Sequence, residues 1–324
     1  MTEDKGLKYC YLLDGNGGGK ALDWAAASAW KPEDGVLWMH LEYSDPYVQK
    51  WVLEESGVSR VCGEALLSEE TRPRSVLTSH GLLLTLRGIN PHPDADPEDM
   101  VALRLWSDGK RIISTRRRRL VSASEIALAI DEGAGPRNAG EFVESITDRL
   151  VERMSSVIDE INDDVDTLEE EVLTQQAYAL RPKLSELRRS TIGLRRYLAP
   201  QREAVMRLYA ERIDWLSDTD RSRLRESADR TTRFVEELDL VRERAIVIQE
   251  DLSSRLSEKM DRTMYVLSIV SAIFLPLGFL TGLLGINIGG IPGADYGGAF
   301  FVFCALLVGI VGFQIWLFKS KKWM

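Results

Sequence analysis

The chain has 324 residues, of which 28% are charged and 44% hydrophobic, and its formal net charge at pH 7 is −9. This length allows one large domain or two ordinary ones. The acidic balance argues against nucleic acid as a partner and is compatible with attraction of cations.

The cysteines and the first residues indicate where the polar part of the chain resides. Cys10, Cys62 and Cys304 form no CxxC pair and no disulfide framework, which favours a reducing cytosol. Residues 1–20 lack the basic start and apolar core of a signal peptide. We therefore expect the charged part, which extends to about Arg262, to stay on the side of the membrane where it is made.

Short apolar runs alternate with turn signals over the first 120 residues and predict a mixed α/β domain, which we assign to residues 1–140. No GxGxxG, phosphate-binding loop or Ser/His/Asp order occurs in it, so we predict no enzymatic activity. Helices are expected around 45–56 and 57–68, and strands at 8–14, 35–42, 74–80, 81–90, 100–106 and 110–115.

Two charged segments of this domain have alternative interpretations. "NPHPDADPED" at 90–99 gathers His92, Asp94, Asp96, Glu98 and Asp99 and could form a weak metal site. Its three prolines and solvated acids favour a plain surface loop. "RRRR" at 116–119 could form a basic patch, but we favour a strand end that pairs with nearby acids.

From about Gly140 the pattern becomes helical, and residues 141–263 are assigned to a long-helix stalk region. The first helix is acidic, and a second, basic helix sets a leucine face against arginines and is expected to end near Pro200. An acidic helix beside a basic one suggests an antiparallel pair with mostly solvated charges. The first helix has apolar residues at alternating spacings of three and four: Val151, Met154, Ile158, Ile161, Val165, Leu168 and Val172.

A third helix is expected to begin near Thr219, with Ser217 or Asp218 as its cap. Its apolar positions are Phe234, Leu238, Val241, Ala245, Ile248 and Leu252. No Pro or Gly follows until Pro276, so the helix should run unbroken into the apolar end of the chain. It would be a stalk of roughly 60 residues, or about 90 Å, and would link the cytosolic domain mechanically to the first membrane span.

Two charge-free stretches, 264–286 and 297–318, are each long enough to cross a membrane. Arg255, Lys259 and Arg262 precede the first stretch, and a basic tail at 319–324 follows the second. The intervening loop, 287–296, has no basic residue. By the positive-inside rule both termini are cytoplasmic and this loop faces outward.

Two helices cannot enclose a polar pathway, so transport would require several copies around one axis. The first stretch offers a suitable stripe, with small residues that let backbones approach closely. Helix packing without a pore is the alternative, and Pro276 is expected to kink the helix. The stripe consists of Met264, Leu267, Ser271, Leu275, Gly278, Gly282 and Gly285.

The end of this stretch resembles a known signature. "GIN" at Gly285, Ile286 and Asn287 is similar to the GxN motif of the CorA superfamily of divalent-cation transporters. "LPLGFLTGLLGINIGGIPG" at 275–293 resembles the zinc-transporting ZntB branch, whereas the magnesium branch more often has YGMN and an acidic loop. The resemblance covers nearly the whole chain and extends to "RPR", "LRGIN", "PEDMVALRLW" and "TRRRRL" at 72–74, 86–90, 97–106 and 115–120.

The resemblance implies a funnel-shaped homopentamer in the bacterial inner membrane, with the first spans lining the pore. Five Asn287 amides would hold an ion through its water shell at the outer mouth. The stripe has no carboxylate, His or Cys, so we expect a hydrated ion and gating by apolar rings. Five copies of Asp295 would form an attracting ring, with a plain solvated loop acid as the alternative. Glu226 and Glu250 align with acidic positions implicated in divalent sensing or conduction in the magnesium branch.

The leading hypothesis is uptake of Zn²⁺ coupled to protons, with Cd²⁺, Ni²⁺ or Co²⁺ as further cargo and no resident cofactor. No carboxylate or His lies within the spans to relay protons, and the direction of transport is open, so zinc efflux is one alternative. Another is a Mg²⁺, Co²⁺ or Ni²⁺ channel closed by metal between cytosolic subunits. A third is a membrane-anchored sensor or scaffold that conducts nothing.

Overall fold

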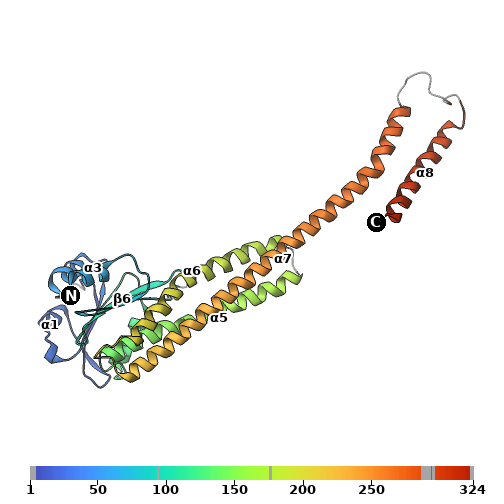
Figure 1. Cartoon of the computed structure of the whole chain (residues 1–324). Helices are drawn as coiled ribbons and strands as arrows, with labels where there is room; N and C mark the ends of the chain where they lie inside the picture. The colour runs from blue at the N-terminus through green and yellow to red at the C-terminus, as the bar shows by residue number, and fades with distance from the viewer. Residues whose placement is uncertain (1–4, 93–94, 175–176, 286–292, 294–295, 322–324) are drawn as a thin grey trace. The chain divides into compact units, whose positions relative to one another are not determined.

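The computed structural model describes residues 5–92, 95–174, 177–285, 293 and 296–321. The chain divides into two compact units, Met1–Glu250 and Asp251–Met324. The first unit holds a β-sheet, short helices, two long helices and the first part of a third, and the second holds the apolar end of that third helix and one further apolar helix (Figure 1). The fold is therefore an N-terminal α/β domain, long helices and two apolar C-terminal helices, as predicted.

The sheet of the first unit has seven strands in the order β2-β1-β3-β7-β6-β5-β4. All neighbouring strands are antiparallel except β3 and β7, which are parallel. Six of these strands confirm the predicted ones. The remaining strand, β2, has three residues, too few to show the alternation of apolar and polar residues that indicates a strand. The strands are β1 (Leu7–Leu13), β2 (Gly19–Ala21), β3 (Leu37–Glu42), β4 (Arg74–Thr78), β5 (Gly81–Gly88), β6 (Val101–Ser107) and β7 (Arg111–Arg116).

Both faces of the sheet are covered, which explains the continuous apolar run in β5. Leu82, Leu84 and Leu86 belong to one core with the long helices. Leu83 belongs to a second core with the short helices, on the opposite face. The short elements are α1 (Trp24–Ala29), η1 (Pro32–Asp34), α2 (Pro46–Lys50), η2 (Trp51–Glu55), α3 (Arg60–Leu67) and α4 (Val121–Asp131), of which α1, η1 and α4 were not predicted.

Helices α5 (Ala139–Thr174) and α6 (Ala177–Ala210) form an antiparallel pair, as expected. Near their connection Lys183 Nζ lies 2.8 Å from Glu171. Toward the sheet, Gln201 Nε2 lies 3.7 Å from the sulfur of Met154. Residue numbers thus rise along α5 as they fall along α6. Every residue of the predicted α5 stripe is buried, from Val151 to Val172.

The expected end of the second helix near Pro200 is wrong, because α6 continues through Pro200 to Ala210. A proline inside a helix costs about 3 kcal/mol through its lost hydrogen bond and its steric clash. The turn that follows is buried in the first core, with Val205 and Leu208 both 0% exposed. Complete burial of each such side chain contributes about 1.5–3 kcal/mol. Burial of this turn therefore offsets the cost of the proline.

Most basic residues of α6 do not pair with the acidic helix beside it. Arg195 Nε donates to Asp239 of α7 at 2.5 Å. Arg189 donates to Asp96 and Glu98, which lie in the loop before β6. The side chains of Arg189 and Arg195 are still 65% and 40% exposed, so these charges are solvated as expected, although a loop and a third helix supply acidic partners.

Helix α7 (Asp218–Gly285) runs unbroken into the apolar end of the chain, as the sequence predicts, and contains Pro276. Ser217 caps it: its Oγ accepts from the main-chain N of Asp220 at 3.2 Å, and Asp220 Oδ2 accepts from the N of Ser217 at 3.1 Å. All six predicted apolar positions from Phe234 to Leu252 are buried. This burial explains how a helix rich in charged residues is held against the rest of the bundle.

Candidate functional site

The second unit contains the apolar end of α7 and helix α8 (Ala299–Ser320). Both helices are long and apolar enough to cross a membrane. No Asp, Glu, His, Lys or Arg occurs at 263–285 or at 299–318. Arg262 lies just before the first of these ranges and Lys319 just after the second. The described helices thus match the predicted spans.

One face of α7 is directed toward α8. The side-chain amide of Gln314 on α8 donates to the main-chain oxygen of Ala272 on α7 at 3.1 Å. Partly buried residues recur on both helices at spacings of three and four, as expected for two packed helices. Among them are Ile269, Ile273, Leu277 and Leu280 on α7, and Phe303, Leu307, Ile310 and Gln314 on α8.

The predicted stripe lies on the opposite face of α7. Met264, Leu267 and Leu275 are 63%, 65% and 73% exposed. At 100° per residue, the centre of the stripe lies roughly 170° from the α8-facing residues. A Cβ atom added to Gly278, Gly282 or Gly285 would meet no heavy atom within 4 Å. The seven stripe residues therefore share an exposed apolar face that α8 does not cover.

The remaining predicted site residues lie elsewhere. Gly285 is the last residue of α7, whereas Ile286, Asn287 and Asp295 lie outside the described residues. Glu226 and Glu250 are exposed on α7 in the first unit. Across the described ranges, no three His, Cys, Asp or Glu side chains converge as metal ligands.

The two charged segments of the α/β domain meet each other. Arg118 Nη1 donates to both carboxylate oxygens of Asp99, at 2.7 and 2.6 Å. Arg117 lies 3.7 Å from Glu69. The arginine run is therefore a strand end paired with nearby acids, and in the described part of the 90–99 segment Asp96, Glu98 and Asp99 bind arginines.

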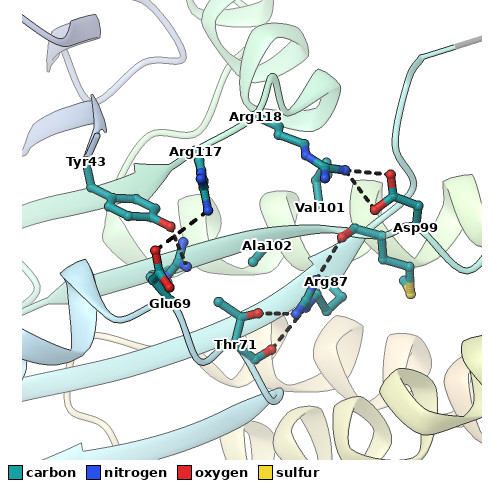
Figure 2. A pocket seen from close by; sticks show the side chains of 11 residues that line it. Tyr43, Glu69, Thr71, Arg87, Asp99, Val101, Ala102, Arg117 and Arg118 are labelled. Carbon is teal, nitrogen blue, oxygen red and sulfur yellow. Dashed lines mark hydrogen bonds and ion pairs between the residues drawn. The ribbon is translucent and has the colours of Figure 1, made fainter. Parts of the chain in front are cut away.

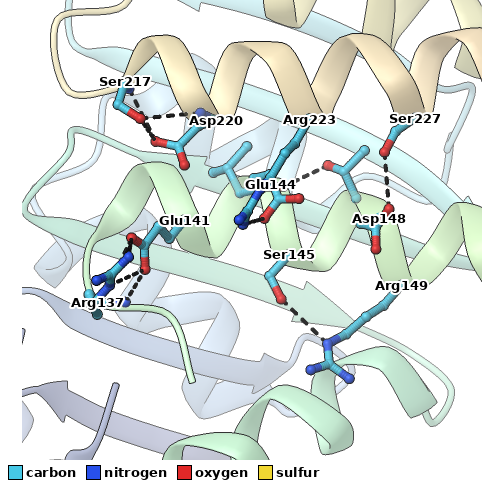
Figure 3. Close-up of polar contacts among 12 residues, drawn as sticks. Arg137, Glu141, Glu144, Ser145, Asp148, Arg149, Ser217, Asp220, Arg223 and Ser227 are labelled. Carbon is cyan, nitrogen blue, oxygen red and sulfur yellow. Dashed lines mark hydrogen bonds and ion pairs between the residues drawn. The ribbon is translucent and has the colours of Figure 1, made fainter. Parts of the chain in front are cut away.

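A buried carboxyl group of the first unit was not predicted. Glu144 of α5 is 8% exposed and lies 3.8 Å from Arg223 of α7 (Figure 3). Burial raises the pKa of Glu144 to about 7; Arg223 opposes this shift, while Asp148 and Asp220 add to it. The position could have been found from the sequence, since Glu144 lies one heptad before Val151 of the buried stripe.

Searches against known proteins place these features in a family. Residues 33–321 match the family described as CorA-like Mg²⁺ transporter protein. The divalent cation transporter CmaX of Pseudomonas aeruginosa is 41% identical, over 99% of this chain and 98% of its own. The zinc transport protein ZntB of Pectobacterium atrosepticum is 37% identical, over 99% of this chain and 97% of its own.

Solved structures agree with this assignment. The structure of full-length CmaX superposes with a TM-score of 0.84 at 40% identity, covering 98% of each chain. The CorA magnesium transporter of Methanocaldococcus jannaschii has a TM-score of 0.79 at 18% identity, covering 97% of this chain and 98% of its own, and thus shares the fold. From the fold, the two apolar helices and these similarities, the chain belongs to the CorA-like Mg²⁺ transporter protein family, a family of divalent-cation transporters.

Proposed function

We propose that the chain carries Zn²⁺ across the bacterial inner membrane as a homopentamer in which five copies of α7 surround the ion path. The observation that carries this proposal is the exposed stripe on the face of α7 opposite α8. Its glycines allow close approach of neighbouring helices. The relative named as a zinc transport protein supports zinc as the cargo.

The chemistry of the stripe favours a hydrated ion. Zn²⁺ prefers nitrogen and sulfur ligands, and the stripe has neither His nor Cys. Removing the water shell beside Leu267 and Leu275 would be costly in an apolar environment. We infer that apolar rings gate the path by dewetting. Five Asn287 amides at the outer mouth would bind the water shell, and five Asp295 carboxylates would attract the cation.

We further propose that Zn²⁺ uptake is coupled to protons. The described spans contain no carboxylate or His, so the coupling groups would lie outside them or the proton would follow the water of the ion. The basic residues on either side of the spans support cytoplasmic termini. Uptake would then move the ion from the side of the loop at 287–296 toward the basic ends.

A second candidate is a Mg²⁺, Co²⁺ or Ni²⁺ channel. One observation favours it: the matching family is described as Mg²⁺ transporters. Metal bound between subunits in the first unit would then close the channel. Glu226 and Glu250 are the acidic candidates for such binding.

The experiment measures ion flux into proteoliposomes that contain the full-length protein, with Zn²⁺ or Mg²⁺ outside and with or without a pH gradient. We expect Zn²⁺ uptake that increases with an inward proton gradient and is lost in Asn287→Ala. Asn16→Ala, the same change in a turn of the first unit, is the matched control and should leave flux intact.

The other outcomes separate the alternatives. Mg²⁺ flux indifferent to the gradient would replace the zinc proposal by the channel. Zn²⁺ flux that occurs only when the proton gradient is reversed would indicate efflux. No flux of either ion, from protein that is pentameric and folded, would contradict transport and leave the sensor or scaffold.

A further inference from the structure

Two arginines share one face of adjacent strands in the first unit, and a third follows the end of the next strand. Thr85 of β5 lies opposite Arg104 of β6, which lies opposite Thr115 of β7. Side chains two residues apart on a strand share a face. Arg87 of β5, two residues after Thr85, therefore joins Arg104 on this face, and Arg117 directly follows Arg116, the last residue of β7. Like charges on neighbouring strands repel each other, so the arrangement requires negative charge from another source.

These arginines line a cavity of about 360 Å³ (Figure 2). Arg104 and Tyr43, which are 3% and 6% exposed, lie at its buried end. The side chains of Arg117 and Arg118 are 66% and 57% exposed. The cavity thus has buried guanidinium groups inside and solvent-accessible ones at its rim.

The guanidinium groups of Arg104 and Arg87 donate to neutral oxygens. Arg104 donates to the main-chain oxygen of Ser68 at 2.8 Å and lies over the ring of Tyr43, 4.5 Å from its centroid. Arg87 donates to the main-chain oxygens of Thr71 and Met100, at 3.0 and 2.8 Å, and to the hydroxyl of Thr71. Within the described part of the chain, neither has a carboxylate at ion-pair distance. Burial of a charge without a counter-ion is unfavourable.

The carboxylates near the cavity do not balance its positive charge. Asp99 is held by Arg118, and Glu69 is 3.7 Å from Arg117. An adjoining cavity shares Glu69, Thr71 and Arg87 with the first and adds Arg72, Arg196 and Glu70. Together the two cavities are lined by six arginines and three carboxylates, an excess of three positive charges on a chain whose net charge is −9.

We propose that this cavity binds a small phosphate-bearing anion. The planar guanidinium group donates two parallel hydrogen bonds to phosphate oxygens, which distinguishes it from a simple point charge. The volume lies within the range of about 300–1,000 Å³ that is typical of small-ligand sites. The ligand would supply the negative charge that Arg104 and Arg87 lack, and Arg117 and Arg118 would close over it from the rim. This site does not depend on the transported cation.

The test is isothermal titration calorimetry, in which pyrophosphate is added to the full-length protein in detergent at constant ionic strength. We expect saturable binding of about one pyrophosphate per chain. The double variant Arg117→Gln/Arg118→Gln should weaken binding at least ten-fold, because it removes both rim donors. Asp99→Asn should strengthen binding several-fold, because it releases Arg118 from its present partner. Arg60→Gln, an exposed arginine paired with Glu64 on α3, is the matched control.

All substituted arginines are exposed, so we expect unchanged melting temperatures in every variant. Binding that is not saturable would overturn the proposal. Equal affinity for pyrophosphate in the double variant and in Arg60→Gln would also overturn it. Displacement of pyrophosphate by sodium chloride at the same concentration would overturn it as well. Weaker binding in Asp99→Asn would also contradict it, since competition with Asp99 has the opposite sign.

Discussion

The side-chain amide of Gln314 on α8 donates to the main-chain oxygen of Ala272 on α7, at 3.1 Å. In an α-helix this oxygen would accept from the N–H group four residues later. That residue is Pro276, which has no N–H group. Gln314 therefore supplies the missing donor within an apolar segment, where no water would satisfy the oxygen. This contact lets α7 continue across its proline and ties α8 to it.

Gln314→Leu should weaken the association of α7 with α8, because it leaves the oxygen of Ala272 without a donor. Hydrogen bonds between membrane helices contribute about 0.6–2 kcal/mol, so we expect a loss of this size in unfolding experiments in detergent. Pro276→Ala restores an N–H group and should remove most of the effect of Gln314→Leu. Additive effects in this double-mutant cycle would show that the two residues are not coupled.

Gln201→Leu should destabilise the first unit. Gln201 is 0% exposed; it accepts from the main-chain N of Arg87 at 2.6 Å and donates to the oxygen of Arg87 at 3.1 Å. Strand β4 begins at Arg74, opposite Thr85, and so does not extend to Arg87. The amide thus takes the place of a strand partner. Two buried groups left unsatisfied at about 1–3 kcal/mol each predict a loss of roughly 2–6 kcal/mol.

Chemical denaturation of the full chain would measure this loss. Gln249→Leu is a suitable control, because Gln249 is an exposed glutamine of α7 whose side-chain oxygen accepts from Arg188. Its effect should stay within about 0.5 kcal/mol, as for most surface substitutions. Equal effects of the two substitutions would contradict a structural role for Gln201.

The first unit should lose stability as the pH rises from about 5 to 8. The pKa of Glu144 is about 7 in the folded chain, above its ordinary value of 4.5. Between these two values the folded state binds more protons than the unfolded state, so the free energy of unfolding falls with rising pH. Glu144→Gln should remove this component. The melting temperature of the variant should therefore fall less between pH 5 and pH 8 than that of the wild type.

Thermal unfolding across this pH range, with both proteins measured at constant ionic strength, would test the expectation. Glu152→Gln provides a control, since Glu152 is exposed on the same helix. A pH profile of Glu144→Gln parallel to that of the wild type would exclude Glu144 as the titrating group.

The stripe on α7 should be reached by water-soluble reagents in the assembled protein. In a background without Cys10, Cys62 and Cys304, we expect Leu275→Cys to react with a charged thiol reagent at least ten-fold faster than Leu277→Cys. The first position is exposed and the second lies on the partly buried face toward α8. Modification at 275 should also block cation flux. Equal rates at the two positions would contradict a pore along the stripe.

Much of the fold could be predicted because its signals are local. The α5 stripe from Val151 to Val172 and the two charge-free segments each follow from residues close in sequence. The predicted helix end near Pro200 was wrong for the same reason. A proline is a local helix breaker and suggested an end, but the helical turn beyond it is buried by residues distant in the sequence. The short strand β2 and helix α1 carry too few residues for a periodic pattern.

The sequence by itself determined the two membrane spans, the continuous helix α7 and the resemblance to the CorA superfamily, since each depends on composition or on a contiguous motif. Only the tertiary structure decided which face of α7 meets α8, through the contact between Gln314 and Ala272. It also decided that Arg87 and Arg104 share one face of the sheet and that Arg117 lines the same cavity. These relationships depend on strand register and helix rotation, which bring together residues that no local pattern connects.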